Sequence, residues 1–225
     1  MKPSALPLFL LLLCLPACAA KQQLSLPELI FDGKANMGCE AVFPQGHWQF
    51  VHSIDFSLKD GSGSTVIGVT RLTDDEIACA LMTVEGFTLF EAVYRQKEGL
   101  EVRRAVEPFD KPAFAEGLMT DVRAIFRAPS LHNGQYGRLA GNVQTCRYTG
   151  VDGRITDIQP AIDDCWQIQT YSADHTMERA IVGRACQKRG ESLVPLHLEL
   201  KGFGQTDYTL KMTLIQAENL GAVSE

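Results

Sequence analysis

Short apolar runs alternate with turn residues along most of the chain, at a spacing of roughly ten residues. The clearest run covers residues 47–58, where Phe50, His52 and Phe56 share one face of a period-two pattern and mostly polar residues occupy the other. A period of two is typical of a strand with one buried face. Residues 60–63 (Asp-Gly-Ser-Gly) follow and are typical of a hairpin tip. The pattern therefore predicts a meander of antiparallel strands.

The same pattern predicts eleven strands, five before a central helix and six after it. They cover residues 47–58, 66–72, 77–84, 87–94, 100–106, 143–149, 154–158, 165–171, 177–186, 193–200 and 208–215. Residues 130–141, rich in Gly and Asn, are expected to form a loop, and residues 26–30 a short helix. An antiparallel sheet of this width must curl or close, and its interior is then filled by side chains or by a ligand.

One amphipathic helix is predicted over residues 110–127. Asp110 is a suitable N-cap, Pro112 falls in the first turn, and Pro129 ends the helix. The apolar face carries Phe114, Leu118, Val122, Ile125 and Phe126. The opposite face, expected to lie in water, carries Glu116, Thr120, Asp121, Arg123 and Arg127. The helix either covers the mouth of the sheet as a lid or completes the core as a plug, and both interpretations stay open.

The N-terminus has the form of a bacterial lipoprotein signal. A short positive start and an apolar run over residues 5–15 lead to Leu15-Pro16-Ala17-Cys18, which resembles the lipobox. Eleven apolar residues are too few to cross a bilayer core of about 30 Å. We expect cleavage before Cys18 and attachment of diacylglycerol and further acyl chains such as palmitate. The alternative is an ordinary secretory signal cut near residues 17–20.

The residue after the modified cysteine bears on the destination of the protein. By resemblance to the sorting rule of enteric-type bacteria, Ala19 in place of Asp favours the outer membrane, facing the periplasm. The expected organisation is a signal peptide (1–17), a lipidated tether with a short helix (18–46), one half-barrel domain (47–217) and a tail (218–225). Loss of Lys2 with the signal changes the formal net charge from −6 to −7. With no long basic run, we expect no nucleic-acid partner.

Five cysteines follow Cys18, and they are Cys39, Cys79, Cys146, Cys165 and Cys186. They include no C-x-x-C pair and no Cys/His spacing suited to zinc. Cysteines in an oxidising periplasm more often pair with each other than bind metal. An odd number leaves at least one without a partner in the chain. We expect one bridge among Cys146, Cys165 and Cys186, with Cys39 and Cys79 as a second candidate pair.

No motif of a known catalytic or cofactor site is present. The histidines occur singly, and those in strand patterns, His52 and His197, are expected to be hydrogen-bonded to a neighbour. Asp163-Asp164 is interpreted as a turn ahead of a strand, in preference to a carboxylate pair or a weak calcium site. Cys79 lies in an apolar run, where a thiol is inert. We therefore expect no enzyme, no metal and no cofactor.

With these elements in place, the chain resembles the half-open β-barrel of the lipoprotein carrier and outer-membrane receptor of the Lol lipoprotein-localisation pathway. It is more similar still to a poorly characterised group of receptor-like bacterial lipoproteins. The likeness covers roughly residues 49–217. It rests on residues 86–90 and the strand through Tyr94, on Pro108 and Pro112 before a helix that contains Asp121, on 166–168 (Trp-Gln-Ile) and on 208–214. The extra cysteines and residues 159–164 depart from the pattern.

The resemblance implies a mainly β (α+β) fold, in which a curved, half-open antiparallel barrel and a helix enclose an apolar cavity for acyl chains. The candidate lining residues are Phe50, Phe56, Phe90, Phe114, Leu118, Val122, Phe126 and Trp166. The expected function is that of a membrane-anchored lipoprotein that binds an acyl chain, a lipid or a lipidated polypeptide for transfer or insertion. The alternative is a disulfide-stapled structural or interaction module of a cell-envelope complex, with a solid core.

Overall fold

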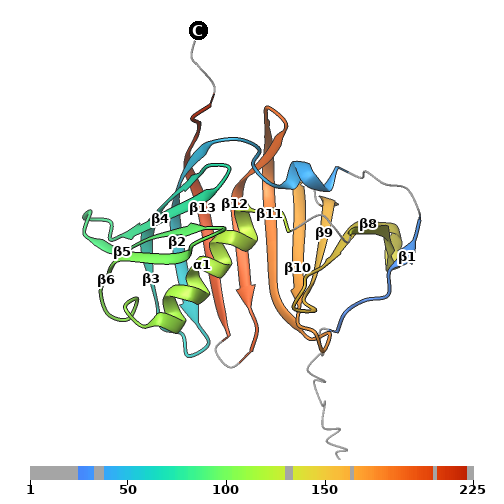
Figure 1. Cartoon of the computed structure of the whole chain (residues 1–225), viewed down its shortest axis with the longest axis horizontal. Helices are drawn as coiled ribbons and strands as arrows, with labels where there is room; N and C mark the ends of the chain where they lie inside the picture. The colour runs from blue at the N-terminus through green and yellow to red at the C-terminus, as the bar shows by residue number, and fades with distance from the viewer. Residues whose placement is uncertain (1–24, 33–37, 130–133, 163–164, 205–206, 222–225) are drawn as a thin grey trace, which may run out of the picture.

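The computed structural model describes residues 25–32, 38–129, 134–162, 165–204 and 207–221. Cys18 with its lipobox, His132 and Asp163-Asp164 lie outside the described residues. Within the described part, thirteen antiparallel strands form one sheet in the order β1-β7-β8-β9-β10-β11-β12-β13-β2-β3-β4-β5-β6 (Figure 1). The edge strands β1 and β6 do not pair with each other. The predicted curved, half-open and mainly β fold is therefore confirmed, with two strands more than expected.

The elements are bounded as follows, with η marking short 3₁₀ helices. They are β1 (Ile30–Phe31), η1 (Cys39–Val42), β2 (Trp48–Leu58), β3 (Gly63–Leu72), β4 (Glu76–Met82), β5 (Thr88–Arg95), β6 (Gly99–Ala105), α1 (Pro112–Phe126), β7 (Gly134–Leu139), η3 (Ala140–Asn142), β8 (Val143–Thr149), β9 (Ile155–Ile162), β10 (Cys165–Tyr171), β11 (Met177–Arg189), β12 (Ser192–Gly202) and β13 (Tyr208–Asn219).

The two additional strands explain where the sequence patterns were wrong. Residues 26–30, expected to be helical, contain no helix, and β1 pairs with β7 through Ile30 opposite Arg138. Strand β7 lies in the segment expected to be a loop. A Cβ atom at Gly137 would lie 2.3 Å from the carbonyl oxygen of Ile30, so this glycine is required for β1 to approach. A glycine that reads locally as a loop signal thus serves strand pairing.

Helix α1 connects the two halves of the sheet. It follows edge strand β6 and precedes β7, which lies near the opposite edge, so the connection must cross the sheet. Figure 1 shows α1 lying diagonally over the strands labelled β2, β13 and β12. Its N-cap is Lys111, not the predicted Asp110, and no side chain caps it. Pro112 occupies the first turn as predicted, because its missing N–H needs no partner there.

A buried ion pair ties the N-terminal segment to the sheet. The guanidinium of Arg147 on β8 donates two hydrogen bonds of 2.7 Å to Asp157 on β9, whose side chain is fully buried. The same guanidinium donates to the carbonyl oxygen of Pro27 at 2.9 Å. A buried ion pair adds little net stability, because the cost of desolvating both charges offsets their attraction, but its directional hydrogen bonds fix the relative positions of the segments that they join. The pair therefore positions the chain ahead of β1.

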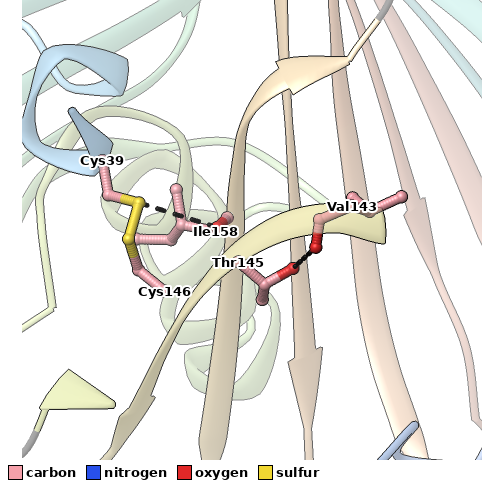
Figure 2. The surroundings of a disulfide bond; sticks show 5 residues. All are labelled: Cys39, Val143, Thr145, Cys146 and Ile158. Carbon is pink, nitrogen blue, oxygen red and sulfur yellow. Dashed lines mark hydrogen bonds between the residues drawn. A yellow bond between two sulfur atoms is a disulfide. The ribbon is translucent and has the colours of Figure 1, made fainter. Parts of the chain in front are cut away.

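Two disulfides staple the same part of the sheet. Cys39 on η1 is bonded to Cys146 on β8, as Figure 2 shows, and its Sγ also lies 3.8 Å from the carbonyl oxygen of Ile158 on β9. Cys165 on β10 is bonded to Cys186 on β11. The expected bridge among Cys146, Cys165 and Cys186 is confirmed, whereas the candidate pair of Cys39 and Cys79 is wrong.

Cys79 is a free and buried thiol. It lies on β4, in the other half of the strand order, whereas η1 packs on the β8–β9 side. Burial raises the pKa of its thiol to about 12, which keeps it protonated. The predicted inertness of this cysteine agrees with that environment.

The two bridges should differ in what they contribute to stability. They close segments with sequence separations of 107 and 21 residues. The chain-entropy model assigns about 4.7 kcal/mol to a loop of about 100 residues and about 3 kcal/mol to one of about 15 residues. Urea unfolding of the paired alanine variants should therefore show the larger loss for Cys39→Ala/Cys146→Ala. Thiol titration of denatured, unreduced chain 19–225 verifies that both bridges are formed. It should detect one thiol in the wild type and none in Cys79→Ala. Equal losses for the two pairs would contradict the ranking.

Candidate functional site

The candidate site is the interface between α1 and the concave face of the sheet. The helix buries Ala115, Met119, Ile125 and Phe126, together with one charged residue, Asp121. The predicted apolar face is only partly the buried one, since Phe114 is 43% exposed and Leu118 and Val122 are half-buried. The prediction that Asp121 lies in water is wrong, because the sheet offers it partners.

Asp121 is the centre of a polar cluster that joins α1 to two strands. Its Oδ1 accepts a hydrogen bond of 2.7 Å from Nε of Arg179 on β11, and its Oδ2 accepts one of 2.6 Å from the hydroxyl of Tyr208 on β13. Burial raises the pKa of Asp121, while the charge of Arg179 and the bond from Tyr208 oppose that rise. Burial and the neighbouring Asp121 carboxylate also raise the pKa of Tyr208. The cluster holds the middle of the helix over the sheet.

Two arginines hold the C-terminal half of the helix. The guanidinium of Arg127 donates to the backbone carbonyl oxygens of Thr73, Asp74 and Glu76 at 2.8, 3.0 and 3.3 Å. The guanidinium of Arg123 lies 3.9 Å from the centre of the Tyr94 ring on β5, a cation–π contact. All of these contacts are polar and partly exposed to water, so they exchange readily for hydration if the helix moves.

A small apolar space lies between α1 and the sheet. Its walls come from β2, β10, β12, the C-terminal end of α1 and the segment after η1. Its volume is about 10 Å³, which is close to the space that one water molecule needs. Phe50 and Phe126 stack in it with ring centres 5.2 Å apart. In this conformation the helix therefore closes the concave face, and an acyl chain would have to displace side chains of α1.

The structure brings three of the eight candidate cavity residues into this lining, namely Phe50, Phe126 and Trp166. Phe90 is fully buried elsewhere, against Phe109, which in turn contacts the edge of the Phe114 ring. Phe56, Leu118 and Val122 are half-buried and line no part of the small space.

The sequence interpretation missed His52, which lies on β2 between the other lining residues. The imidazole is 2% exposed and lies 6.1 Å from the Phe50 ring and 6.0 Å from the Phe126 ring. Burial lowers its pKa to about 4. Among the hydrogen bonds of the described residues none involves this imidazole, so the expected neighbouring partner is absent there. A histidine on the apolar side of an alternating strand was the available signal.

The described residues contain neither a candidate metal site nor a candidate membrane-spanning helix. No three side chains of His, Cys, Asp or Glu come together there as a metal site. No helix in the described part combines the length and the apolar character needed to cross a membrane.

The buried histidine predicts a pH dependence of stability. Because the folded-state pKa of His52 is about 4 and the ordinary value is 6.5, the unfolded chain binds this proton first as the pH falls. Stability should therefore fall between those two pH values, by about 3 kcal/mol in total. Urea unfolding at a series of pH values measures it, and His52→Leu should lack this component. The exposed His197→Leu is the matched control, and equal pH slopes for wild type and His52→Leu would refute the assignment.

The fold was compared with known proteins. No protein-family model matches the sequence, and no curated protein matches it. A LolA superfamily protein from Nitrosomonas europaea has a TM-score of 0.52 at 9% identity, over 80% of this chain and 89% of that chain.

Two further solved structures lie just below a TM-score of 0.5. A putative outer membrane lipoprotein-sorting protein domain from Vibrio parahaemolyticus gives 0.49 at 7% identity, over 83% of this chain and 91% of that chain. A DUF1329 family protein from Desulfovibrio piger gives 0.48 at 7% identity, over 83% and 90%. The similarity to the Nitrosomonas europaea protein, at 9% identity, concerns the fold alone. The chain therefore has a LolA-like fold.

Proposed function

We propose that this protein is a lipid-anchored carrier or receptor at the outer membrane, facing the periplasm. It binds an acyl chain, a lipid or a lipidated polypeptide between α1 and the sheet and passes it on without covalent chemistry. The observation that carries the proposal is the closure of an unclosed, apolar sheet by a single helix that is fastened through polar contacts. The LolA-like fold supports the same class of function.

The contacts between α1 and the sheet must allow the helix to move if a ligand is to enter. A buried ion pair contributes little net stability, since desolvation offsets the attraction between the charges. Asp121, Arg179 and Tyr208 thus specify where α1 lies without binding it tightly. Apolar surface uncovered when the helix moves is covered again by an acyl chain, at about 25 cal/mol for each Å². Opening and ligand binding are thereby coupled.

One end of the sheet carries exposed apolar side chains. Phe87 and Val84, in the turn after β4, are 72% and 65% exposed, while Val106, just after β6, and Phe114, in the first turn of α1, are 42% and 43% exposed. Strand β5 begins after Phe87 and pairs with the end of β6, so both segments lie at the same end. Exposed apolar groups of this kind favour contact with lipid or with a lipidated partner. They support entry of the ligand near the N-terminal end of α1.

The described chain begins at the same end of the sheet. Ser25 pairs with Thr176 after the β10–β11 turn. Strand β4 lies six steps from β10 in the strand order, and each antiparallel step reverses the direction. The two strands therefore run in the same direction. The turns that follow β10 and β4 thus share one end of the sheet. A lipidated Cys18, seven residues before Ser25, would hold Ser25, at this end of the sheet, within about 25 Å of a membrane.

The small size of the space beneath α1 favours a second function, that of a structural module with a solid core. The space beneath α1 is only about 10 Å³ in this conformation, which also suits a structural module with a solid core. Two disulfides in the half of the sheet around β8–β11 fit that alternative as well. Acyl-chain binding by the purified protein distinguishes the two, because a solid-core module has no ligand to take up.

The polar cluster supplies one test of the carrier. Tyr208→Phe removes one hydrogen bond to Asp121 and should cost about 1 kcal/mol of stability. It should also speed the uptake of a fluorescent fatty-acyl methyl ester by chain 19–225, which contains every described residue, because α1 leaves the sheet more readily. Stopped-flow fluorescence and urea unfolding measure the two effects.

The matched control for that test is Tyr171→Phe. Tyr171 is 1% exposed, and its hydroxyl donates to Gln169 at 3.0 Å on β10, away from α1. This variant should lose similar stability with unchanged uptake. If both variants speed uptake equally, general loosening explains the effect and the role of α1 as the closing element is wrong.

Leu118→Gln tests whether the helix covers a ligand or seals a core. Leu118 is half-buried, so the new amide reaches water, and the carrier predicts weaker binding of the same ester probe with a small change in unfolding temperature. A solid-core module predicts no binding by the wild type and a loss of stability from the lost packing, about 2 kcal/mol. The exposed Glu116→Gln on the same helix is the control. A large fall in unfolding temperature, with no binding by the wild type, would leave the structural module as the function.

A further inference from the structure

His52 is the polar side chain with free hydrogen-bonding capacity in the space beneath α1. The described residues lining that space are otherwise apolar, and the indole N–H of Trp166 is already bonded to the carbonyl oxygen of Leu193 at 3.2 Å. The imidazole is 98% buried, given its 2% exposure, and makes no hydrogen bond with the described residues. Its nitrogens are not fully enclosed, since they are not among the fully buried, unpartnered side-chain atoms of the described residues, so a bound molecule can reach them.

We propose that His52 donates a hydrogen bond to the carbonyl oxygen of an acyl ester or acyl amide, so that the site takes neutral acylated molecules in preference to ionised fatty acids. This rests on the proposed function, because the ligand enters beneath α1. The same ester chemistry occurs in glycerolipids and in the diacylglyceryl group of lipoproteins. The inference adds the class of head group to the acyl chain already proposed.

The charge state of the ring supports a neutral partner. With a pKa lowered to about 4, the imidazole is uncharged near neutral pH and offers one N–H donor and one nitrogen acceptor. No Lys or Arg is among the described residues that line the space. An ionised carboxylate brought there would lose its hydration and gain no opposite charge. A carbonyl oxygen loses far less and satisfies the imidazole.

The position of His52 puts it in the path of an incoming chain. The Phe126 ring of α1 lies 5.2 Å from the Phe50 ring and 6.0 Å from the imidazole. A chain that displaces Phe126 therefore meets both side chains of β2, one apolar and one polar. The apolar neighbours hold methylene groups, while His52 fixes where along the groove the carbonyl comes to rest.

The test uses the mature, lipidated protein in phospholipid nanodiscs and photoreactive probes with one common alkyl chain. The probes end in a methyl ester, in a permanently ionised sulfonate or in plain hydrocarbon. Wild type should be labelled by the ester about tenfold more than by the other two, with the labels in peptides of β2 and α1. A diacylglycerol probe and an S-diacylglyceryl lipopeptide probe then show which source of ester is preferred.

Two variants separate the hydrogen bond from packing. His52→Leu keeps an apolar volume and should reduce ester labelling to the hydrocarbon level, whereas His52→Gln keeps a donor and should restore much of the preference. Unfolding temperatures of both verify that they fold. An unchanged ester preference in His52→Leu overturns this inference and leaves acyl-chain binding intact. Absence of labelling by every probe in wild type overturns the inference together with the proposed function.

Discussion

The rest of the structure depends on the hydrogen bonds that Asp121 accepts from Arg179 and Tyr208. A sheet of thirteen strands that does not close leaves an apolar concave face, and the segment between β6 and β7, which contains α1, passes over it. Apolar packing alone allows a helix to slide or rotate on such a surface. Two directional bonds to β11 and β13, of 2.7 and 2.6 Å, define one position. The carboxylate thus decides which residues of α1 are covered.

The stabilising features are unevenly distributed over the sheet. Both disulfides and the Arg147–Asp157 pair lie on β8–β11 and the segments packed on them. The strands from β2 to β6 carry the free Cys79 and face α1 through aromatic rings and through carbonyl groups that accept from Arg127. One half of the barrel is covalently tied, and the other half is closed by contacts that water or a ligand can replace. This asymmetry fits a protein whose helix moves against a constant frame.

The space beneath α1 is lined by apolar side chains and one neutral polar group. Phe50, Phe126 and Trp166 supply apolar contacts, and His52 is held neutral among them by burial. A site of this composition favours long apolar chains and accommodates a neutral polar group at one place. It offers nothing to balance a buried charge. The exposed apolar residues at the end of the sheet continue this character toward the surface.

Local periodicity in the sequence determined the strands, the helix and the overall class of fold, because side-chain alternation and helical spacing are set by neighbours along the chain. A separate N-terminal motif predicts lipidation at Cys18, which lies outside the described residues. Strand β7 was missed because Gly137, which the close approach of β1 requires, is locally indistinguishable from a loop glycine.

Only the tertiary structure decided the partners. Asp121 meets residues 58 and 87 positions away, and Cys39 pairs across 107 positions. The isolation of His52 is likewise a property of the folded interior. Contacts over such separations depend on how the whole sheet curves and on where its connecting helix lies, and no local pattern of residues carries that information.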